Sequence, residues 1–194
     1  MEKSVVPFAD ELLIIGGSAG SLDVLLQVLP ELRVPVSKAI IIVVHRKNIN
    51  DLILTELLSA KTTVPVKEAE EKDPIQQNII YIVPPDYHLL IENDKTFSLD
   101  VSEKVNYSRP SIDVTFSSAA EVFGNKLTCI LLSGANADGV EGLKAAKRNG
   151  GTIIVQHPDS AEIPYMPLQA IKAIEADYVL NDEELKDYFA RLNV

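Results

Sequence analysis

The stretch Leu12-Leu13-Ile14-Ile15-Gly16-Gly17-Ser18-Ala19-Gly20-Ser21 decides the fold of this chain. An apolar run of strand length leads into a glycine-rich turn. The segment 22–29 that follows has the apolar spacing of a helix and stops at Pro30. A strand that enters a helix through a tight turn is the first unit of an α/β fold.

Further apolar runs, rich in β-branched residues, extend this pattern to residues 39–44, 79–83, 127–132 and 152–155. Short runs without polar alternation suit strands covered on both faces, as in a parallel sheet. Segments with helical spacing alternate with them, at 50–58 (with Asn50 or Asp51 as N-cap), 111–123, 139–148, 161–176 and 182–192. We therefore predict a three-layer, Rossmann-like α/β fold with a mainly parallel sheet.

Residues 87–105 break this alternation. His88–Ile91 and Thr96–Leu99, joined by a short polar segment, predict a β-hairpin. We expect it to be a small antiparallel addition at one edge of the sheet. Because no linker separates the segments, the prediction is a single domain over residues 1–194.

The composition narrows the classes of function. A net charge of -10 and the lack of a Lys/Arg run disfavour binding to nucleic acid or to an anionic membrane surface. Cys129 is the one cysteine, which excludes an internal disulfide, and with three scattered histidines a metal site is not expected. Nor do we expect another cofactor. The N-terminal run has neither the pattern of a signal peptide nor that of a spanning helix, so we expect a cytoplasmic protein without membrane insertion.

The turn after the first strand carries the clearest chemical signal. Gly16-Gly17-Ser18-Ala19-Gly20 fits the pattern G-x-S-x-G, in which a tight turn presents a serine hydroxyl and helix N–H groups stabilise an oxyanion. The turn predicts a serine hydrolase with Ser18 as nucleophile. A phosphate cradle or a turn without chemistry is the alternative at this point. A Walker loop is excluded because no Gly-Lys-Ser/Thr follows, and the spacing G-x-G-x-x-G is lacking.

A serine nucleophile needs a base and a carboxylate that orients the base. Several candidates follow the predicted strands, where ligands bind in open α/β sheets. The candidate bases are His45, His88 and His157, and the candidate carboxylates are Asp86, Asp138 and Asp159. Spacing alone does not choose among them. The early position of Ser18 argues against the α/β-hydrolases, in which the nucleophile strand comes late.

A set of segments supplies a further indication: Ile14–Ser21, Val43–His45, Ile80–Pro85 with His88-Leu89, Arg109–Asp113, Leu131–Gly142, Gln156–Pro158 and Tyr165–Pro167. Together and in this order they resemble the catalytic domain of the CheB-type protein-glutamate methylesterases of bacterial chemotaxis. The resemblance covers roughly residues 10 to 185, and the ordered set is more specific than any single segment.

The resemblance implies a catalytic triad of Ser18, His45 and Asp138, with His88 and His157 as rim or structural residues. It implies hydrolysis of glutamate methyl esters, and in some members deamidation of glutamines, on a methylated receptor or signalling protein. It also gives candidates for the oxyanion hole, near the N–H groups of Ala19 and Ala135, and for contact with an acidic receptor surface, Arg46 and Arg109. The full set of candidate lining residues is Ala19, Gly20, Arg46, Arg109, Gly134, Ala135 and Asn136.

Three departures from the family pattern accompany the resemblance. Ser18-Ala19-Gly20-Ser21 replaces Ser-Thr-Gly-Gly, and Ser133-Gly134-Ala135-Asn136 replaces Thr-Gly-Met-Gly. Only about ten residues precede the first strand, too few for the usual receiver domain, which implies a separate regulatory protein or none. The alternative function is a weakly active or non-enzymatic relative that binds a signalling partner, and a third is a small-molecule esterase.

Overall fold

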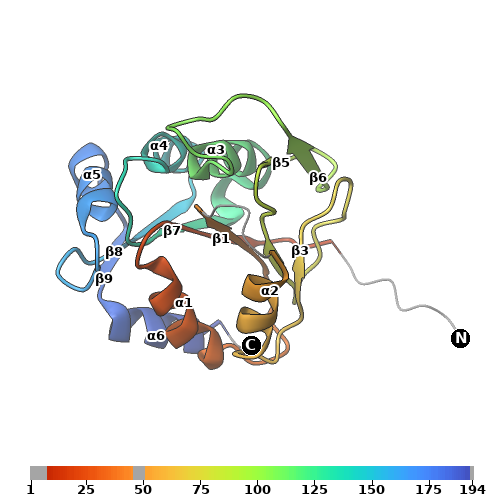
Figure 1. The fold of residues 1–194 in the computed structure, drawn as a ribbon, viewed down its shortest axis with the longest axis horizontal. Helices are drawn as coiled ribbons and strands as arrows, with labels where there is room; N and C mark the ends of the chain where they lie inside the picture. Colours follow the sequence, from red (N-terminus) through yellow and green to blue (C-terminus); the bar gives the residue numbers. More distant parts are fainter. Residues whose placement is uncertain (1–7, 46–50, 193–194) are drawn as a thin grey trace, which may run out of the picture.

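The computed structural model describes residues 8–45 and 51–192, except for the side chains of Asp51 and Leu52. Its middle layer is a seven-stranded sheet with the order β3-β4-β2-β1-β7-β8-β9 (Figure 1). All neighbouring strands in it are parallel, which confirms the predicted α/β class. The strands are β1 Leu12–Gly17, β2 Ala39–Val44, β3 Val66–Glu68, β4 Ile80–Ile82, β7 Leu127–Leu131, β8 Thr152–Gln156 and β9 Tyr178–Leu180.

Helices cover both faces of this sheet (Figure 1). One face carries α3 (Ile112–Phe123), α4 (Val140–Arg148) and α5 (Tyr165–Ala173), and the other carries α1 (Ser21–Val28), α2 (Asp51–Ser59) and α6 (Asp182–Ala190). Successive side chains of β1 enter different cores: Leu12 and Ile14 pack under α3 and α4, and Leu13 and Ile15 pack under α1 and α6. This double cover is the physical reason why the central strands are apolar at nearly every position.

The strand order changes direction at β1. The first strand pairs with β2 on one side and with β7 on the other. The chain leaves β1 through α1 to β2 and returns to β7 only after α3, so the sheet is extended in opposite directions from β1. Ligands of such sheets bind at this switch point, beyond the carboxyl ends of the strands. Ser18 and the segment 132–139 follow the two strands that flank it.

The predicted hairpin is present, as β5 (His88–Ile91) paired antiparallel with β6 (Phe97–Asp100). Its predicted place was wrong, because the two strands form a separate sheet and do not extend an edge of the main sheet. The hairpin packs on α3 instead: the hydroxyl of Thr115 donates to Leu89 O (2.9 Å), and Ile91 N donates to Ser118 Oγ (3.0 Å).

Other differences lie at the ends of the sheet. The strands β3 and β9 were not predicted, because each has three residues and no fully buried side chain. The helix predicted over 161–176 is shorter, since Ile163 is bonded through its backbone to the 133–134 segment and α5 begins after Pro164. Ser111 precedes α3 as its N-cap. The predicted N-cap at Asn50 or Asp51 stays a prediction, because Asn50 and the side chain of Asp51 lie outside the described part of the chain. Cys129 is fully buried, as expected of a small apolar residue.

Candidate active site

The turn that carries Ser18 is built by close approaches that only glycine permits. A Cβ on Gly17 would lie 2.4 Å from the Cβ of Ser21, at the start of α1. Gly20 has φ of 82°, in the left-handed region that glycine adopts without strain, and it caps α1. The chain therefore reverses from β1 into α1 within a few residues, which leaves Ser18 at the carboxyl edge, the side of the sheet where its parallel strands end.

Ser18 is held through its main chain. Ser18 N donates to Ser133 O (2.9 Å), which joins the turn to the segment after β7. The carbonyl of Ser18 accepts from Ser21 N (3.1 Å) and from the Ser21 hydroxyl (2.6 Å). The segment after β7 also runs close to the nucleophile candidate, since a Cβ on Gly134 would lie 3.0 Å from Ser18 Cβ. The Ser18 residue is partly exposed, so its position suits attack on a ligand that enters from solvent.

His45 follows β2 at the same edge. Its backbone N donates to Gly17 O (3.2 Å), which places it beside the Ser18 turn. Its Nε2 lies 2.7 Å from Asp138 Oδ2, and its side chain is only 12% exposed. The second ring nitrogen, Nδ1, lies 3.4 Å from the hydroxyl of Ser108. An imidazole with one nitrogen on a carboxylate has the other nitrogen free to take a proton.

Asp138 follows β7 and its side chain is fully buried. A buried carboxylate needs several donors, and Asp138 receives hydrogen bonds at both oxygens, from His45 Nε2, Asn106 Nδ2, Ser111 Oγ, Ile112 N and Asp113 N. Burial raises the pKa of Asp138, but the hydrogen bonds from His45, Ile112 and Asp113 outweigh burial and hold the pKa below its ordinary value. Asp138 is therefore a carboxylate at neutral pH, suited to orienting and stabilising an imidazolium.

The first turn of α3 supplies the backbone donors for this carboxylate. Ser111 is the N-cap of α3, and the free N–H groups of Ile112 and Asp113 point at Asp138 (2.6 and 3.1 Å). A helix N-terminus carries a partial positive charge and unpaired N–H groups, so it stabilises an anion. The local preference of Ser111 for the N-cap thus also builds the binding site of the carboxylate.

A second buried carboxyl, Asp113, lies against the first. Its oxygens accept from Gly142 N (2.7 Å) and from Asn106 Nδ2 (2.8 Å), and the same Asn106 nitrogen also donates to Asp138. Burial and the charge of Asp138 together raise the pKa of Asp113 to about 6, against the hydrogen bonds from Gly142 and Asn106, which lower it. Two buried carboxyls bridged by one amide make this side of the site sensitive to charge.

The other candidate bases and acids are placed elsewhere. His88 is buried, with Nδ1 accepting from Ser111 N (3.1 Å) and Nε2 at 3.0 Å from Glu103 O, so it braces the segment before α3. His157 follows β8 and its Nδ1 accepts from Asp159 N. Asp159 is 94% exposed, and Asp86 is exposed with φ of 62°. Of the three histidines, His45 has the short contact with a buried carboxylate.

The candidate lining residues occupy different places. Ala19, Gly20 and Gly134 lie in or against the Ser18 turn, and Gly134 N is engaged with Ile163 O (3.1 Å). In the described part of the chain, no acceptor is found for Ala19 N or Ala135 N. Asn136 accepts from Asp138 N (3.0 Å), which forms the turn that presents Asp138. Arg109 Nη1 is bonded to Val101 O and Ser102 O (2.7 Å each), and Arg46 lies outside the described residues.

Sequence reasoning assigned no role to Asn106, Ser108 or Ser111, which all contact His45 or Asp138. Ser111 had a usable signal, since a serine directly before an apolar helical run is a typical N-cap. Asn106 and Ser108 had none, because they lie in a segment without periodicity and contact residues 32 and 63 positions away.

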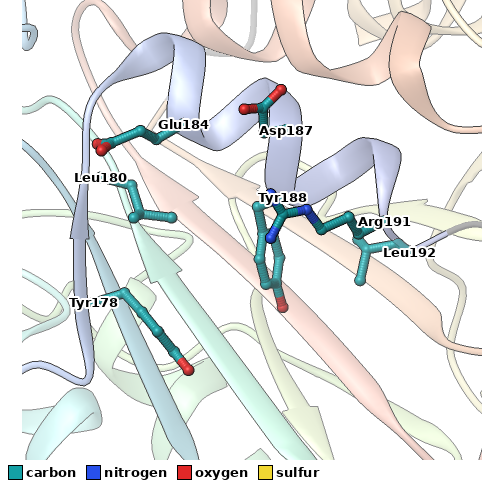
Figure 2. Close-up of a pocket in the computed structure, with 7 residues that line it drawn as sticks. All are labelled: Tyr178, Leu180, Glu184, Asp187, Tyr188, Arg191 and Leu192. Atoms are coloured by element: carbon teal, nitrogen blue, oxygen red, sulfur yellow. The ribbon is translucent and has the colours of Figure 1, made fainter.

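A cavity of about 450 Å³ lies between β9 and α6, lined by Tyr178, Leu180, Glu184, Asp187, Tyr188, Arg191 and Leu192 (Figure 2). No candidate site residue lines this cavity. Within residues 8–45 and 51–192, no group of three His, Cys, Asp or Glu side chains could hold a metal ion. None of the helices described is both long and apolar enough to cross a membrane.

A parallel α/β sheet with a serine turn after its first strand and a His–Asp pair at the same edge is an arrangement of serine hydrolases. The sequence model of the family described as CheB methylesterase matches residues 13–189, and the chain belongs to this family. Its match with the crystal structure of the Thermotoga maritima CheB methylesterase catalytic domain has a TM-score of 0.89 at 31% identity and covers 94% of this chain and 98% of that one.

Two relatives show how far the similarity extends. A putative protein-glutamate methylesterase/protein-glutamine glutaminase from Leptospira interrogans is 46% identical over 94% of this chain and 95% of its own length. The protein-glutamate methylesterase/protein-glutamine glutaminase of Thermotoga maritima is 33% identical over 88% of this chain, and the match spans 50% of that protein. The chain therefore corresponds to nearly the whole of the first relative and to about half of the second.

Proposed function

We propose that this chain is a protein-glutamate methylesterase in which Ser18 is the nucleophile, His45 the base and Asp138 the carboxylate that orients the base. The observation that carries the proposal is the 2.7 Å contact between His45 Nε2 and the fully buried Asp138, directly beside the Ser18 turn. The family membership and the names of the relatives support the choice of a methyl ester as substrate.

The first half of the reaction forms an acyl-enzyme. Ser18 Oγ attacks the carbonyl carbon of the glutamate methyl ester while His45 Nδ1 takes the hydroxyl proton. Asp138 keeps the proton of Nε2 in place and stabilises the imidazolium. The tetrahedral intermediate then collapses, His45 gives its proton to the leaving oxygen, and methanol departs. Water activated by His45 attacks the acyl-enzyme in the second half and releases the free glutamate side chain.

We assign the oxyanion hole to the N–H groups of Ala19 and Ala135. Ala19 follows the nucleophile at the start of α1, which is the usual place of such a donor. Ala135 follows Gly134, whose N–H is engaged with Ile163 O and is therefore not a donor for the substrate. Both N–H groups come from the backbone, so the replacement of the usual Thr and Met by alanine leaves the donors in place.

The substrate that we propose is a glutamate methyl ester on a receptor or other signalling protein, and a second reaction is deamidation of glutamine at the same site. Both activities stand in the printed names of the relatives. An amide differs from the ester only in its leaving group, ammonia in place of methanol, and uses the same groups. Regulation by a separate protein, a cytoplasmic location and a single domain over residues 1–194 stay predictions.

The test measures methanol released from a methylated receptor fragment and ammonia released from the same fragment with glutamine at the modified position. We expect release by the wild-type protein, and a fall of about 10⁴-fold or more in Ser18→Ala, because the nucleophile acts as a unit with its base. His45→Asn is expected to behave in the same way, while the matched variant His157→Asn keeps its activity. Unchanged release by Ser18→Ala would remove the proposal, and no release by the wild-type protein would favour a partner-binding role.

A further inference from the structure

The long connection from β6 to α3 (Figure 1) contains a tight turn whose residues contact Asp138 and His45. Val105 N donates to Ser108 O (3.2 Å) and Ser108 N donates to Val105 O (2.9 Å), so the turn contains two central residues, Asn106 and Tyr107. Both have positive φ, 50° and 63°. This is the pattern of a type I′ turn, in which the second position favours glycine. A tyrosine there is strained, because its Cβ crowds the backbone.

The residues on either side of Tyr107 touch the catalytic side chains. Asn106 Nδ2 donates to Asp138 Oδ1 (3.1 Å) and to Asp113 Oδ2 (2.8 Å). Ser108 Oγ lies 3.4 Å from His45 Nδ1. The residues directly before and after Tyr107 thus fix its backbone relative to Asp138 and His45.

The Tyr107 side chain itself takes no part in these contacts. It is 97% exposed, and within the described part of the chain it has no hydrogen bond and no ring contact. Val101 and Val105, in the same connection, are also exposed (64% and 36%). A large aromatic residue in a strained conformation, held beside the site and not used by the fold, is a candidate for function, since strain of this kind is retained where function requires it.

We propose that Tyr107 is a specificity-determining residue that contacts the polypeptide surface next to the modified glutamate side chain. The proposal rests on the proposed function and deepens it. A small ester occupies only the space around Ser18, whereas a protein substrate must also lie against the residues that surround the site. Tyrosine suits such a contact, because it offers a large rigid surface with few side-chain torsions to immobilise. Tyr107 then favours an ester carried on a protein over a free small ester.

The test compares two substrates in matched variants. Tyr107→Asn keeps a residue that tolerates positive φ and removes the aromatic ring, and Tyr107→Phe restores the ring. We expect KM for a methylated receptor fragment to rise about tenfold in Tyr107→Asn with kcat unchanged, and to stay within about twofold in Tyr107→Phe. Hydrolysis of p-nitrophenyl acetate should be the same in all three proteins. Tyr178→Asn is the control, because Tyr178 of β9 is half-exposed. It should leave the hydrolysis of both substrates unchanged.

Each other outcome overturns the proposal. An unchanged KM for the receptor fragment in Tyr107→Asn removes the contact. An equal loss on both substrates shows that the tyrosine only supports the turn. If the wild-type protein releases no methanol from the fragment, the proposed function has failed and this proposal fails with it. Methanol release by the wild type with an unchanged KM in Tyr107→Asn rejects the role of Tyr107 alone.

Discussion

The turn around Ser18 and the pocket around Asp138 are held by different kinds of hydrogen bond. At the turn, the bonds that fix the backbone run mainly between main-chain groups, from His45 N to Gly17 O and from Ser18 N to Ser133 O. In the pocket, a side-chain carboxylate is the acceptor for all the bonds, and the side chains of His45, Asn106 and Ser111 are among its donors.

This difference explains why the Ser18 turn tolerates departures from the family pattern. Main-chain bonds form with almost any residue, so the turn accommodates Ala19 and Ser21 where the family usually has Thr and Gly. The pocket has no such freedom, because a buried carboxylate that loses a donor keeps its desolvation cost. We therefore expect substitutions in the pocket to reduce activity far more than substitutions at the turn, Ser18 itself excepted.

After the losses expected for Ser18→Ala and His45→Asn, the largest effect is expected for Asp138→Asn. The variant keeps the volume of the side chain but replaces one acceptor with a donor that faces His45 Nε2, so His45 loses the tautomer that leaves Nδ1 as a base. We expect kcat for methanol release to fall by about 10³–10⁴-fold, as in other Ser–His–Asp sites. The matched variant Asp159→Asn changes a 94% exposed carboxylate at the same edge and should retain full activity. Equal losses in the two variants would contradict the assignment of the acid.

A smaller effect is expected for Asp113→Asn. It concerns thermal stability and depends on pH. The pKa of Asp113 is raised from 3.8 to about 6, so the folded protein holds this proton more tightly than the unfolded chain. Its contribution to stability is complete below pH 3.8 and is lost as the pH rises to about 6. Asp138, with a lowered pKa, contributes in the opposite sense and loses its contribution as the pH falls below its ordinary value.

Asp113→Asn has no carboxyl at this position, so it does not show the loss of stability that the wild-type protein shows as the pH rises to about 6. We expect the difference in Tm, Asp113→Asn minus wild type, to increase as the pH rises from about 4 to about 6, with each kcal/mol giving about 2–4 °C in a chain of this size. Calorimetry at several pH values measures it. A Tm difference that is constant over this range would show that Asp113 titrates normally. Asp159→Asn serves again as the exposed control.

The sequence predicted the parts of this molecule that depend on burial and local spacing. Five strands of the main sheet were predicted because each is almost entirely apolar and covered on both faces. The edge strands β3 and β9 are too short and too polar to show this pattern. Ser18 could be predicted as the nucleophile from its glycine-rich turn. The role of Asn106 as a donor to Asp138 could not be predicted, since the two residues are brought together only by the path of the whole connection from β6 to α3.

The smallest effect is expected at the turn, for Ser21→Gly, which introduces the residue usual in the family. Ser21 is buried and its hydroxyl donates to Ser18 O (2.6 Å), a bond that glycine cannot make. The loss of this bond and the greater freedom of glycine should lower the free energy of unfolding by about 1–2 kcal/mol, measured by urea denaturation. Activity should change by less than about threefold, because Ser21 N still donates to Ser18 O and holds the turn. A loss as large as that of Asp138→Asn would mean that the Ser18 turn depends on side chains as strongly as the pocket does.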